Sequence, residues 1–306
     1  MSKKPEKKKK KKKSWISTLI LVLIFLIGLS VMLYPTVSDW WNSFHQTRAI
    51  EHYVEAVAAM SEEDIQAYFD AADEYNAHLA ETGTHFVLSD EEQEWYDSLL
   101  DPDGNGLIGY ITISNINVYL PIYHGTSAGV LAVGVGNLEG TSLPVGGETT
   151  HTVLSAHRGL PSARLFTDLD EMQEGDTFSI TVLDRTITYQ VDQIRIVLPE
   201  ETSDLAISFG EDYATLVTCT PYGVNTHRLL VRGHRIESNM DDVYVASEGT
   251  KLPTYIVFPA IMIPLLFIAL AGMLIYYRKR RRSLNEDEIA RMVSVPDDWD
   301  TDTTDN

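Results

Sequence analysis

The chain has 306 residues and a formal net charge of −20, a length that allows one to three domains. The charge is uneven: residues 1–13 contain nine Lys and one Glu, whereas residues 39–250 contain eight Arg, no Lys and 35 acidic residues, a net −27. So acidic a middle region repels phosphate backbones, which excludes nucleic acid as its partner. The chain has a single cysteine, Cys219, which excludes an internal disulfide and a cysteine-rich zinc site.

Residues 14–38 are the first predicted element, an uncharged stretch of 25 residues behind the basic end at residues 1–13. A bilayer core of about 30 Å takes about 20 helical residues, so this stretch is long enough to cross it. A cleaved signal peptide shares the basic start and the apolar run and is the alternative. Residues 34–37 (YPTV) make a poor cleavage site, so we predict an uncleaved transmembrane helix.

Residues 39–106 follow as a predicted extracellular helical region. Apolar residues recur there at helical spacings of three and four, at Ala49, Ile50, Tyr53, Val54 and Val57. Ser61 and the three acidic residues after it resemble a capping box that begins a second helix.

The sequence DPDGNGLI at residues 101–108 ends that region and resembles the front of an EF-hand calcium loop. Thr112 stands at loop position twelve, where a bidentate Glu is expected. Asp, Asn and Gly also build ordinary turns, so we predict a turn and no metal site.

Residues 107–250 are predicted to be the catalytic domain. Short β-rich runs alternate with turns, at residues 109–113, 117–120, 177–182, 186–191 and 214–218. This spacing of strands and turns predicts a mainly β fold, a single closed or nearly closed barrel.

Residues 252–277 form a second uncharged stretch of 26 residues, and RKRRR follows at residues 278–282. Pro259 and Pro264 inside it are tolerated in a lipid-embedded helix. Lysine and arginine stay on the cytoplasmic side of membrane spans. We therefore predict a two-pass protein with both termini cytoplasmic, residues 278–306 forming a cytoplasmic tail.

Cys219 ends one predicted strand, and residues 226–232 return as the next strand after a turn. This hairpin would place Arg228 close to Cys219. A cation beside a thiol favours the nucleophilic thiolate; alternatively, the guanidinium would hold the oxyanion that forms when the thiolate attacks a carbonyl. A buried structural cysteine is the other interpretation of a lone Cys.

A cysteine nucleophile needs an acid/base for its leaving group, and the chain has nine histidines. His227 adjoins Arg228, and neighbours on a strand point to opposite faces, so both cannot face Cys219. His157 follows the apolar strand at residues 152–156 and precedes a rigid turn, which suits a site. A surface-loop histidine is the alternative, because spacing alone cannot bring His157 to Cys219.

Three segments resemble the sortase family, most closely its class C, pilus-building branch. They are TLVTCTPYGVNTHRLLVRG at residues 215–233, SAHRGLPSARLF at 155–166 and INVYLPIYHGT at 116–126. The likeness spans residues 107–236, and the two flanking apolar stretches also resemble class C. It implies an eight-stranded β-barrel with an N-terminal helical extension and two flanking transmembrane helices.

The resemblance implies that Cys219 is the nucleophile, His157 the general acid/base and Arg228 the oxyanion or substrate-positioning residue. Cys219 would cleave the Thr–Gly bond of an LPXTG-like sorting signal, and a lysine of the next pilin subunit would resolve the thioester as an isopeptide bond. A cell-wall precursor is an alternative final acceptor. No cofactor is needed, because the thioester retains the energy of the cut bond. The implied location is the cell membrane of a Gram-positive-type bacterium.

This sequence departs from the class C pattern at one point. Many class C sortases carry an Asp-Pro-aromatic lid over the cysteine, but here Asp101-Pro102 is followed by Asp103. Either the lid is missing or another aromatic, such as Trp95 or Tyr96, fills its role. We hypothesise that residues 86–106 still cover the groove.

The missing lysines support a second hypothesis. A lysine-free outer domain offers no amine to its own thioester, and its acidic surface would attract a lysine donor. Compositional drift toward acid in an exported protein is the alternative. Rival functions are a housekeeping sortase that attaches proteins to the wall, a thiol peptidase that only hydrolyses, and a membrane scaffold in which Cys219 is merely buried.

Overall fold

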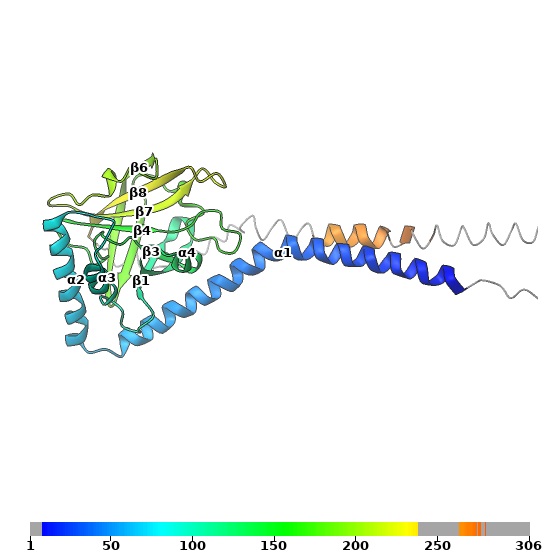
Figure 1. Cartoon of the computed structure of the whole chain (residues 1–306), viewed down its shortest axis with the longest axis horizontal. Helices are drawn as coiled ribbons and strands as arrows, with labels where there is room; N and C mark the ends of the chain where they lie inside the picture. Colours follow the sequence, from blue (N-terminus) through cyan, green and yellow to red (C-terminus); the bar gives the residue numbers. More distant parts are fainter. Residues whose placement is uncertain (1–7, 238–262, 274, 277–278, 280–306) are drawn as a thin grey trace, which may run out of the picture. The chain divides into compact units, whose positions relative to one another are not determined.

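The computed structural model describes residues 8–237, 263–273, 275, 276 and 279, and the chain divides into two compact units. One unit comprises Met1–Leu33 and Lys251–Asn306, and the other comprises Tyr34–Thr250. The helices are α1 Lys8–Ala58, α2 Glu62–Thr82, α3 Asp90–Asp97 and α4 Ala128–Val133 (Figure 1). The strands are β1 Leu107–Ile113, β2 Val118–His124, β3 Val135–Asn137, β4 Thr150–Ser155, β5 Thr177–Val182, β6 Arg185–Val197, β7 Asp212–Thr220 and β8 His227–Ile236.

The first unit contains the apolar part of α1. Within the described residues, the stretch Leu19–Ala58 is the one helix long and apolar enough to cross a membrane. Leu23, Ile24 and Ile27 are each more than half exposed, as lipid-facing side chains are. This confirms the predicted apolar N-terminal helix and supports membrane anchoring.

The predicted second span at residues 252–277 lies partly outside the described residues. Its described part holds a shorter apolar helix, Ile263–Met273. Phe267 of that helix packs edge-on against Phe25, with ring centroids 5.6 Å apart. The cytoplasmic tail at residues 278–306 and most of the basic end at residues 1–13 fall outside the described residues, so those predictions stay predictions.

The helical region of the second unit is confirmed, with one correction to its buried face. Ile50, Tyr53 and Val57 of α1 are buried as their spacing predicts, but Val54 is 46% exposed. Tyr53 fixes α1 to the barrel: its hydroxyl donates to the Ile108 carbonyl at 2.6 Å and accepts the Leu183 N–H at 2.7 Å.

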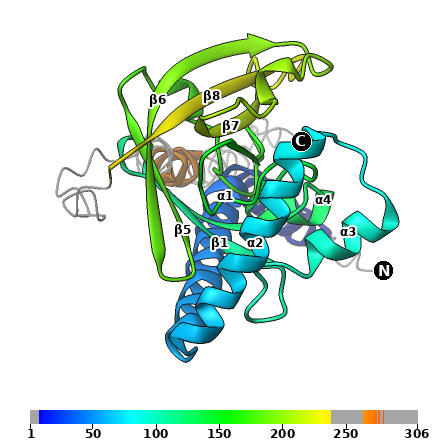
Figure 2. The ribbon, with the colours of Figure 1, turned by 90° about the vertical axis from the view of Figure 1, so that its left-hand side faces the viewer.

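Helices α2 and α3 pack on the barrel beside α1 (Figure 2). Ser61 caps α2 as predicted, its hydroxyl accepting the Asp64 N–H at 3.1 Å. Asn76 of α2 then makes two hydrogen bonds to the backbone of Leu143, at 3.1 and 2.8 Å. A capping box between Ser89 and Glu92 begins α3.

The strands close into the predicted eight-stranded barrel, in the order β1-β2-β3-β4-β7-β8-β6-β5. Two of its neighbouring pairs, β2 with β3 and β4 with β7, are parallel, and the remaining ones are antiparallel. The parallel β4–β7 pair brings together two segments some sixty residues apart, because Ser155 pairs with Val217. This pairing places the candidate site.

The wall formed by β4, β7 and β8 is apolar on both faces. Leu154, Leu216 and Val231 point into the main core of the barrel. The alternate residues Val153, Val217 and Leu230 join a second cluster outside the wall, with Val197 at the end of β6 and Leu205 from the β6–β7 connection. Because both faces are buried, these strands read as continuous apolar runs rather than alternating ones.

The EF-hand-like loop is an ordinary turn. The Asp101 carboxylate accepts the Gly106 N–H at 2.9 Å, and the Asp103 carboxylate accepts the Asn105 N–H at 3.0 Å. Both carboxylates therefore satisfy the backbone of their own loop. Within the described residues, no group of three or more His, Cys, Asp or Glu side chains is arranged to hold a metal ion.

Candidate active site

His157 follows the end of β4, Cys219 lies near the end of β7, and Arg228 lies near the start of β8; we call these three residues the strand-end row. Cys219 on β7 pairs directly with Arg228 on β8. On the other side, Ser155 pairs with Val217, and the Ala156 N–H continues this ladder to the Val217 carbonyl at 3.1 Å. His157 lies two residues beyond Ser155, and Cys219 lies two residues beyond Val217.

Cys219 and Arg228 share one face of the wall. Side chains two residues apart on a strand point the same way, and directly paired residues lie on the same face. Cys219 therefore follows Val217, and Arg228 follows Leu230, on the face that carries the outer apolar cluster. His157, Cys219 and Arg228 are all half-buried, so the row is shielded but accessible.

The cysteine strand is fixed from behind. The Thr218 side chain is buried on the core side, where its hydroxyl donates to the Ala156 carbonyl at 2.8 Å. A side-chain hydrogen bond thus joins the chain just before Cys219 to the chain just before His157. The spacing of the two strand ends follows from this bond and the β4–β7 ladder.

The β7–β8 hairpin positions Arg228. Its turn closes when the Val224 and Asn225 N–H groups both donate to the Pro221 carbonyl, at 3.0 Å each. Arg228 Nη1 then donates to the carbonyls of His227, at 3.1 Å, and Asn225, at 3.4 Å. The guanidinium is therefore held at the hairpin end of the wall, on the strand that pairs with the cysteine strand.

An apolar groove of about 370 Å³ leads up to the row. Its floor is the outer face of the wall, and Arg228 is among its lining residues. The apolar lining comes from separate segments of the chain: Phe86, Leu131, Leu138, Val153, Val197, Leu198, Pro199, Leu205, Val217 and Leu230. A groove of this kind suits an extended ligand with apolar side chains.

The lid hypothesis needs a correction in its residues. Tyr96 is fully buried, and its hydroxyl donates to the Asn137 side chain at 2.9 Å. Trp95 packs edge-on against Tyr75 of α2, with centroids 5.2 Å apart. Neither lines the groove; of residues 86–106, Phe86 does.

The segment that carries Phe86 is fastened to the barrel on both sides of the groove. The His85 N–H donates to the Gly140 carbonyl at 3.4 Å, and the Thr84 hydroxyl accepts the Ile207 N–H at 3.2 Å. Gly140 has a positive φ, and a Cβ there would lie 1.6 Å from the His85 carbonyl oxygen, so only glycine permits this approach.

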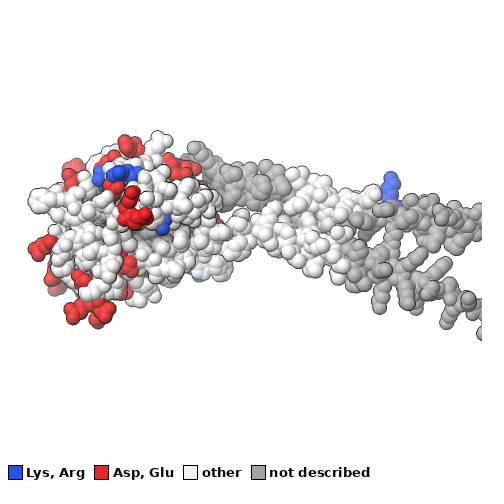
Figure 3. Space-filling view, turned by 45° about the horizontal axis from the view of Figure 1, so that its top comes forward, with Lys and Arg blue, Asp and Glu red and all other residues white. Residues whose placement is uncertain are grey.

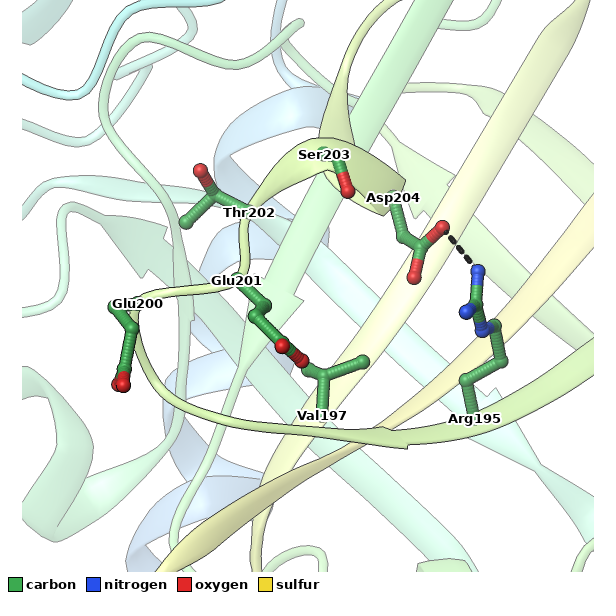
Figure 4. A pocket seen from close by; sticks show the side chains of 7 residues that line it. All are labelled: Arg195, Val197, Glu200, Glu201, Thr202, Ser203 and Asp204. Carbon is green, nitrogen blue, oxygen red and sulfur yellow. Dashed lines mark hydrogen bonds and ion pairs between the residues drawn. The ribbon is translucent and has the colours of Figure 1, made fainter.

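A second, polar pocket of about 510 Å³ adjoins the groove and shares Val197, Glu201 and Thr202 with it. Figure 4 shows Arg195 paired with Asp204 on one side, at 2.7 Å, and Glu200 lying apart from that pair. Acidic side chains are spread over the face of the barrel unit seen in Figure 3, with fewer basic ones between them. The approach to the row is thus acidic on its β6–β7 side.

Two other barrel histidines are structural. His151 Nδ1–H donates to the Ala206 carbonyl at 2.9 Å, and Nε2 accepts the Thr215 hydroxyl at 2.7 Å. His124 is buried against Tyr96, with ring centroids 5.0 Å apart. Burial lowers the pKa of both imidazoles, because the charged form loses its hydration.

Similarities to known proteins agree with this architecture. The sortase domain family model matches residues 111–236. The chain is 52% identical to sortase C1 from Streptococcus agalactiae, and the match covers 63% of this chain and 100% of that crystal structure, with a TM-score of 0.62. Sortase C from Clostridium perfringens, solved with the C-terminal cell wall sorting motif, is 43% identical at a TM-score of 0.56, covering 63% of this chain and 100% of that one.

A curated relative, sortase D from Bacillus subtilis (strain 168), is 29% identical over 138 residues, which are 44% of this chain and 67% of the relative. A closed eight-stranded barrel with these similarities defines a cysteine transpeptidase. The chain belongs to the sortase family, and the solved sortase C structures place it with class C.

The sequence did not reveal Phe86 or the groove lining. Phe86 lies in a short connection between two helices, and an exposed aromatic there was the one available signal. Leu131 of α4, Leu138 and Leu205 lie far apart in the sequence, and only the folded chain gathers them.

Proposed function

We propose that the chain is a membrane-anchored class C sortase that cleaves an LPXTG-like sorting signal and joins pilin subunits through a lysine isopeptide bond. The observation that carries this proposal is the strand-end row: a lone thiol on β7 paired with an arginine that lines an apolar groove, and a histidine two residues beyond the end of the adjoining strand β4. The family membership supplies the reaction class, acyl transfer through a cysteine.

In the first half-reaction, Cys219 Sγ attacks the threonine carbonyl carbon of the sorting signal. His157 takes the thiol proton and delivers it to the departing glycine amine, which leaves a thioester on Cys219. The Arg228 guanidinium stabilises the negative charge that develops on the carbonyl oxygen. Its anchorage on the hairpin carbonyls keeps it in place, so little reorganisation is needed during the reaction.

In the second half-reaction, the Nζ of a pilin lysine attacks the thioester carbonyl. His157 accepts the amine proton and returns it to the departing Cys219 thiolate, so the enzyme is regenerated. The acidic surface would attract the ammonium form of the donor, and residues 39–250 contain no lysine that competes for the thioester.

The groove supports an extended sorting signal as the first substrate. Leucine and proline side chains gain about 0.8 kcal/mol for each CH₂ group that they bury, and the groove wall is largely aliphatic. The related sortase C from C. perfringens was solved with its C-terminal cell wall sorting motif. By analogy, we assign the same class of peptide to this groove.

We also propose a two-pass topology, with residues 39–250 extracellular and both termini cytoplasmic. The basic residues at 1–13, before the first apolar stretch, and at 278–282, after the second, support this orientation. A reporter fused after residue 306 that is accessible only from the cytoplasm would support the topology. Labelling of that reporter from outside the cell would overturn it.

The test uses the purified full-length chain in detergent, with a pilin pair in which one subunit carries the sorting signal and the other a candidate acceptor lysine. Wild type should build heat-resistant ladders, whereas Cys219→Ala should build none. An acceptor with every lysine replaced by arginine is the matched substrate control, and it should leave only cleaved signal.

Two alternatives predict other products from the same incubation. A housekeeping-type enzyme would transfer the cleaved protein to a cell-wall precursor amine and leave the pilin lysine unmodified. A peptidase that only hydrolyses would release the same acid whether or not an amine is present. A membrane scaffold would keep its function in Cys219→Ala.

A further inference from the structure

A second set of contacts lies behind the strand-end row and joins the histidine loop to the cysteine turn. Arg158 directly follows His157, and Thr220 directly follows Cys219. Arg158 Nη1 donates to the Thr220 hydroxyl at 3.2 Å, while Nη2 pairs with Asp170. Consecutive residues of an extended chain point to opposite sides. We therefore expect the hydrogen bond between Arg158 and Thr220 to lie on the opposite side of the wall from the row.

The same two segments also interlock through Tyr222 and Gly159. Gly159 has a φ of +72°, and a Cβ built there would lie 2.9 Å from the Tyr222 ring. The ring therefore rests on the backbone of the histidine loop, which glycine alone accommodates. The Arg158 guanidinium lies 5.9 Å from the centroid of that ring, within the range of a cation–π contact.

The Arg158 side chain is unusually buried for an arginine. Only 9% of it is exposed, and within the described residues its Nε has no hydrogen-bond partner. A buried unpaired donor costs free energy, so hydrogen-bond satisfaction alone does not explain this placement. The planar fork of a guanidinium holds two partners at a fixed angle, which the single ammonium of a lysine cannot do.

We propose that Arg158 is a positioning residue that fixes the spacing between His157 and Cys219. The fork ties the loop that begins at His157 both to Thr220, beside the nucleophile, and to Asp170, farther along the same loop. Arg158 itself touches no reacting atom; it acts through the two residues next to it. This inference rests on the proposed roles of His157 and Cys219.

The test is a double-mutant cycle on the full-length chain, with Arg158→Gln, Thr220→Val and the combined variant. Proton transfer depends steeply on geometry, so we expect Arg158→Gln to lower kcat for a sorting peptide about 10–100-fold, with KM changed less than about twofold. Thr220→Val removes the same hydrogen bond from the other side and should reproduce most of that loss. The combined variant should be no worse than Arg158→Gln, because both changes break one contact.

Arg164→Gln is the matched control. Arg164 lies in the same loop and pairs with Asp168, so its replacement removes an arginine–aspartate pair without touching Thr220. It should lower Tm by about as much as Arg158→Gln and leave kcat near wild type. Arg158→Lys should recover little activity, because one ammonium cannot replace the fork. Equal kcat losses in Arg164→Gln and Arg158→Gln, in proportion to Tm, would show a structural role only and overturn the proposal.

A second readout does not depend on the substrate: the pH dependence of Cys219 alkylation by a small reagent. The profile of Arg158→Gln should move from that of wild type toward that of His157→Ala, because the imidazole no longer lies beside the sulfur. A profile identical to wild type would overturn the positioning role. If no sorting peptide is turned over at all while this profile still moves, the proposed reaction fails and the positioning role stands.

Discussion

The β4–β7–β8 wall carries a histidine at each end, and the two ends differ in what surrounds them. At one end, His151, Tyr213 and His234 form a row by the same register that builds the strand-end row. His151 is buried with both ring nitrogens bonded, whereas His157 at the other end is half-buried beside a cysteine.

The arginines at the two ends of the wall also differ in their partners. Near His151, Arg232 is held by Asp192 through two hydrogen bonds, at 3.1 and 2.9 Å, and its guanidinium lies 4.2 Å from the Tyr213 ring centroid. Near His157, Arg228 is held only by backbone carbonyls within the described residues, so its charge is not neutralised by a carboxylate. One end is closed by its own partners, and the other is available to a substrate.

Substitutions of the histidines and the cysteine at the two ends should show the largest difference in activity. We expect Cys219→Ala to abolish peptide cleavage and His157→Gln to lower kcat/KM about 100–10,000-fold, the usual contribution of a general acid/base. His151→Gln should stay within about threefold of wild type at a temperature where the variant is folded. Activity that survives in His157→Gln but is lost in folded His151→Gln would assign the acid/base to the wrong end of the wall.

The arginines of the two ends should differ next. Arg228→Gln should lower kcat about 100–1,000-fold, as expected for the loss of an oxyanion donor, with Tm nearly unchanged. Arg232→Gln breaks the ion pair with Asp192 and should lower Tm while kcat stays close to wild type. Steady-state kinetics and thermal unfolding of both variants check this; a large kcat loss in Arg232→Gln would contradict the division.

The stability of the fold should depend on pH through His124 and His151. Burial in the folded state lowers the pKa of His124 and of His151. Below the ordinary histidine pKa of about 6.5, the unfolded chain therefore binds more protons than the folded chain does. Stability is therefore complete above about pH 6.5 and falls as pH decreases toward the folded pKa values, by at most about 1.4 kcal/mol per pH unit for each histidine. Denaturant unfolding between pH 5 and 8 measures this, and His151→Gln should flatten the curve. An unchanged slope would show that His151 does not contribute.

The groove should show a smaller, binding effect. Phe86→Ala removes one apolar lining residue of the groove and leaves the three side chains of the strand-end row in place, so KM for the sorting peptide should rise about three- to tenfold with kcat nearly unchanged. Trp95→Ala, in the same region but packed on α2, is the control and should affect Tm rather than KM. A fall in kcat alone in Phe86→Ala would contradict a binding role.

The smallest expected signal concerns the missing lysines. Glu201→Lys places an amine beside the groove, and we expect a minor fraction of enzyme linked to its own substrate fragment during turnover. Glu55→Lys, on α1, is the control and should remain unmodified. Intact-mass analysis measures the fraction, and the absence of any adduct in Glu201→Lys would count against the hypothesis.

Much of the barrel could be predicted from sequence because its strands carry clear β-rich runs between turns. β3 was missed because Val135–Asn137 is too short to show a pattern. β6 extends to Val197, beyond the predicted residue 191, because pairing with β8 continues along its partly exposed half. Tyr96 was a candidate for the missing lid aromatic, but it is buried in the core, where its hydroxyl donates to the Asn137 side chain.

The candidate site was also only partly predictable from the sequence. The pairing of Cys219 with Arg228 is local, and the hairpin pattern predicted it. The pairing of β4 with β7 is not local, so no spacing in the sequence could bring His157 to Cys219, and only the family resemblance suggested it. The bond between Arg158 and Thr220 depends on that same parallel pairing, which is why it emerged only from the fold.

Mass spectrometry of the acyl-enzyme tests the central claim most directly. The full-length chain is mixed with a sorting-signal peptide, quenched in acid within one turnover, and digested. We predict a thioester between Cys219 and the threonine carboxyl of the cleaved peptide, released when a lysine amine or hydroxylamine is added. Peptide cleavage without any adduct on Cys219, or an equal rate of cleavage in Cys219→Ala, would contradict this mechanism.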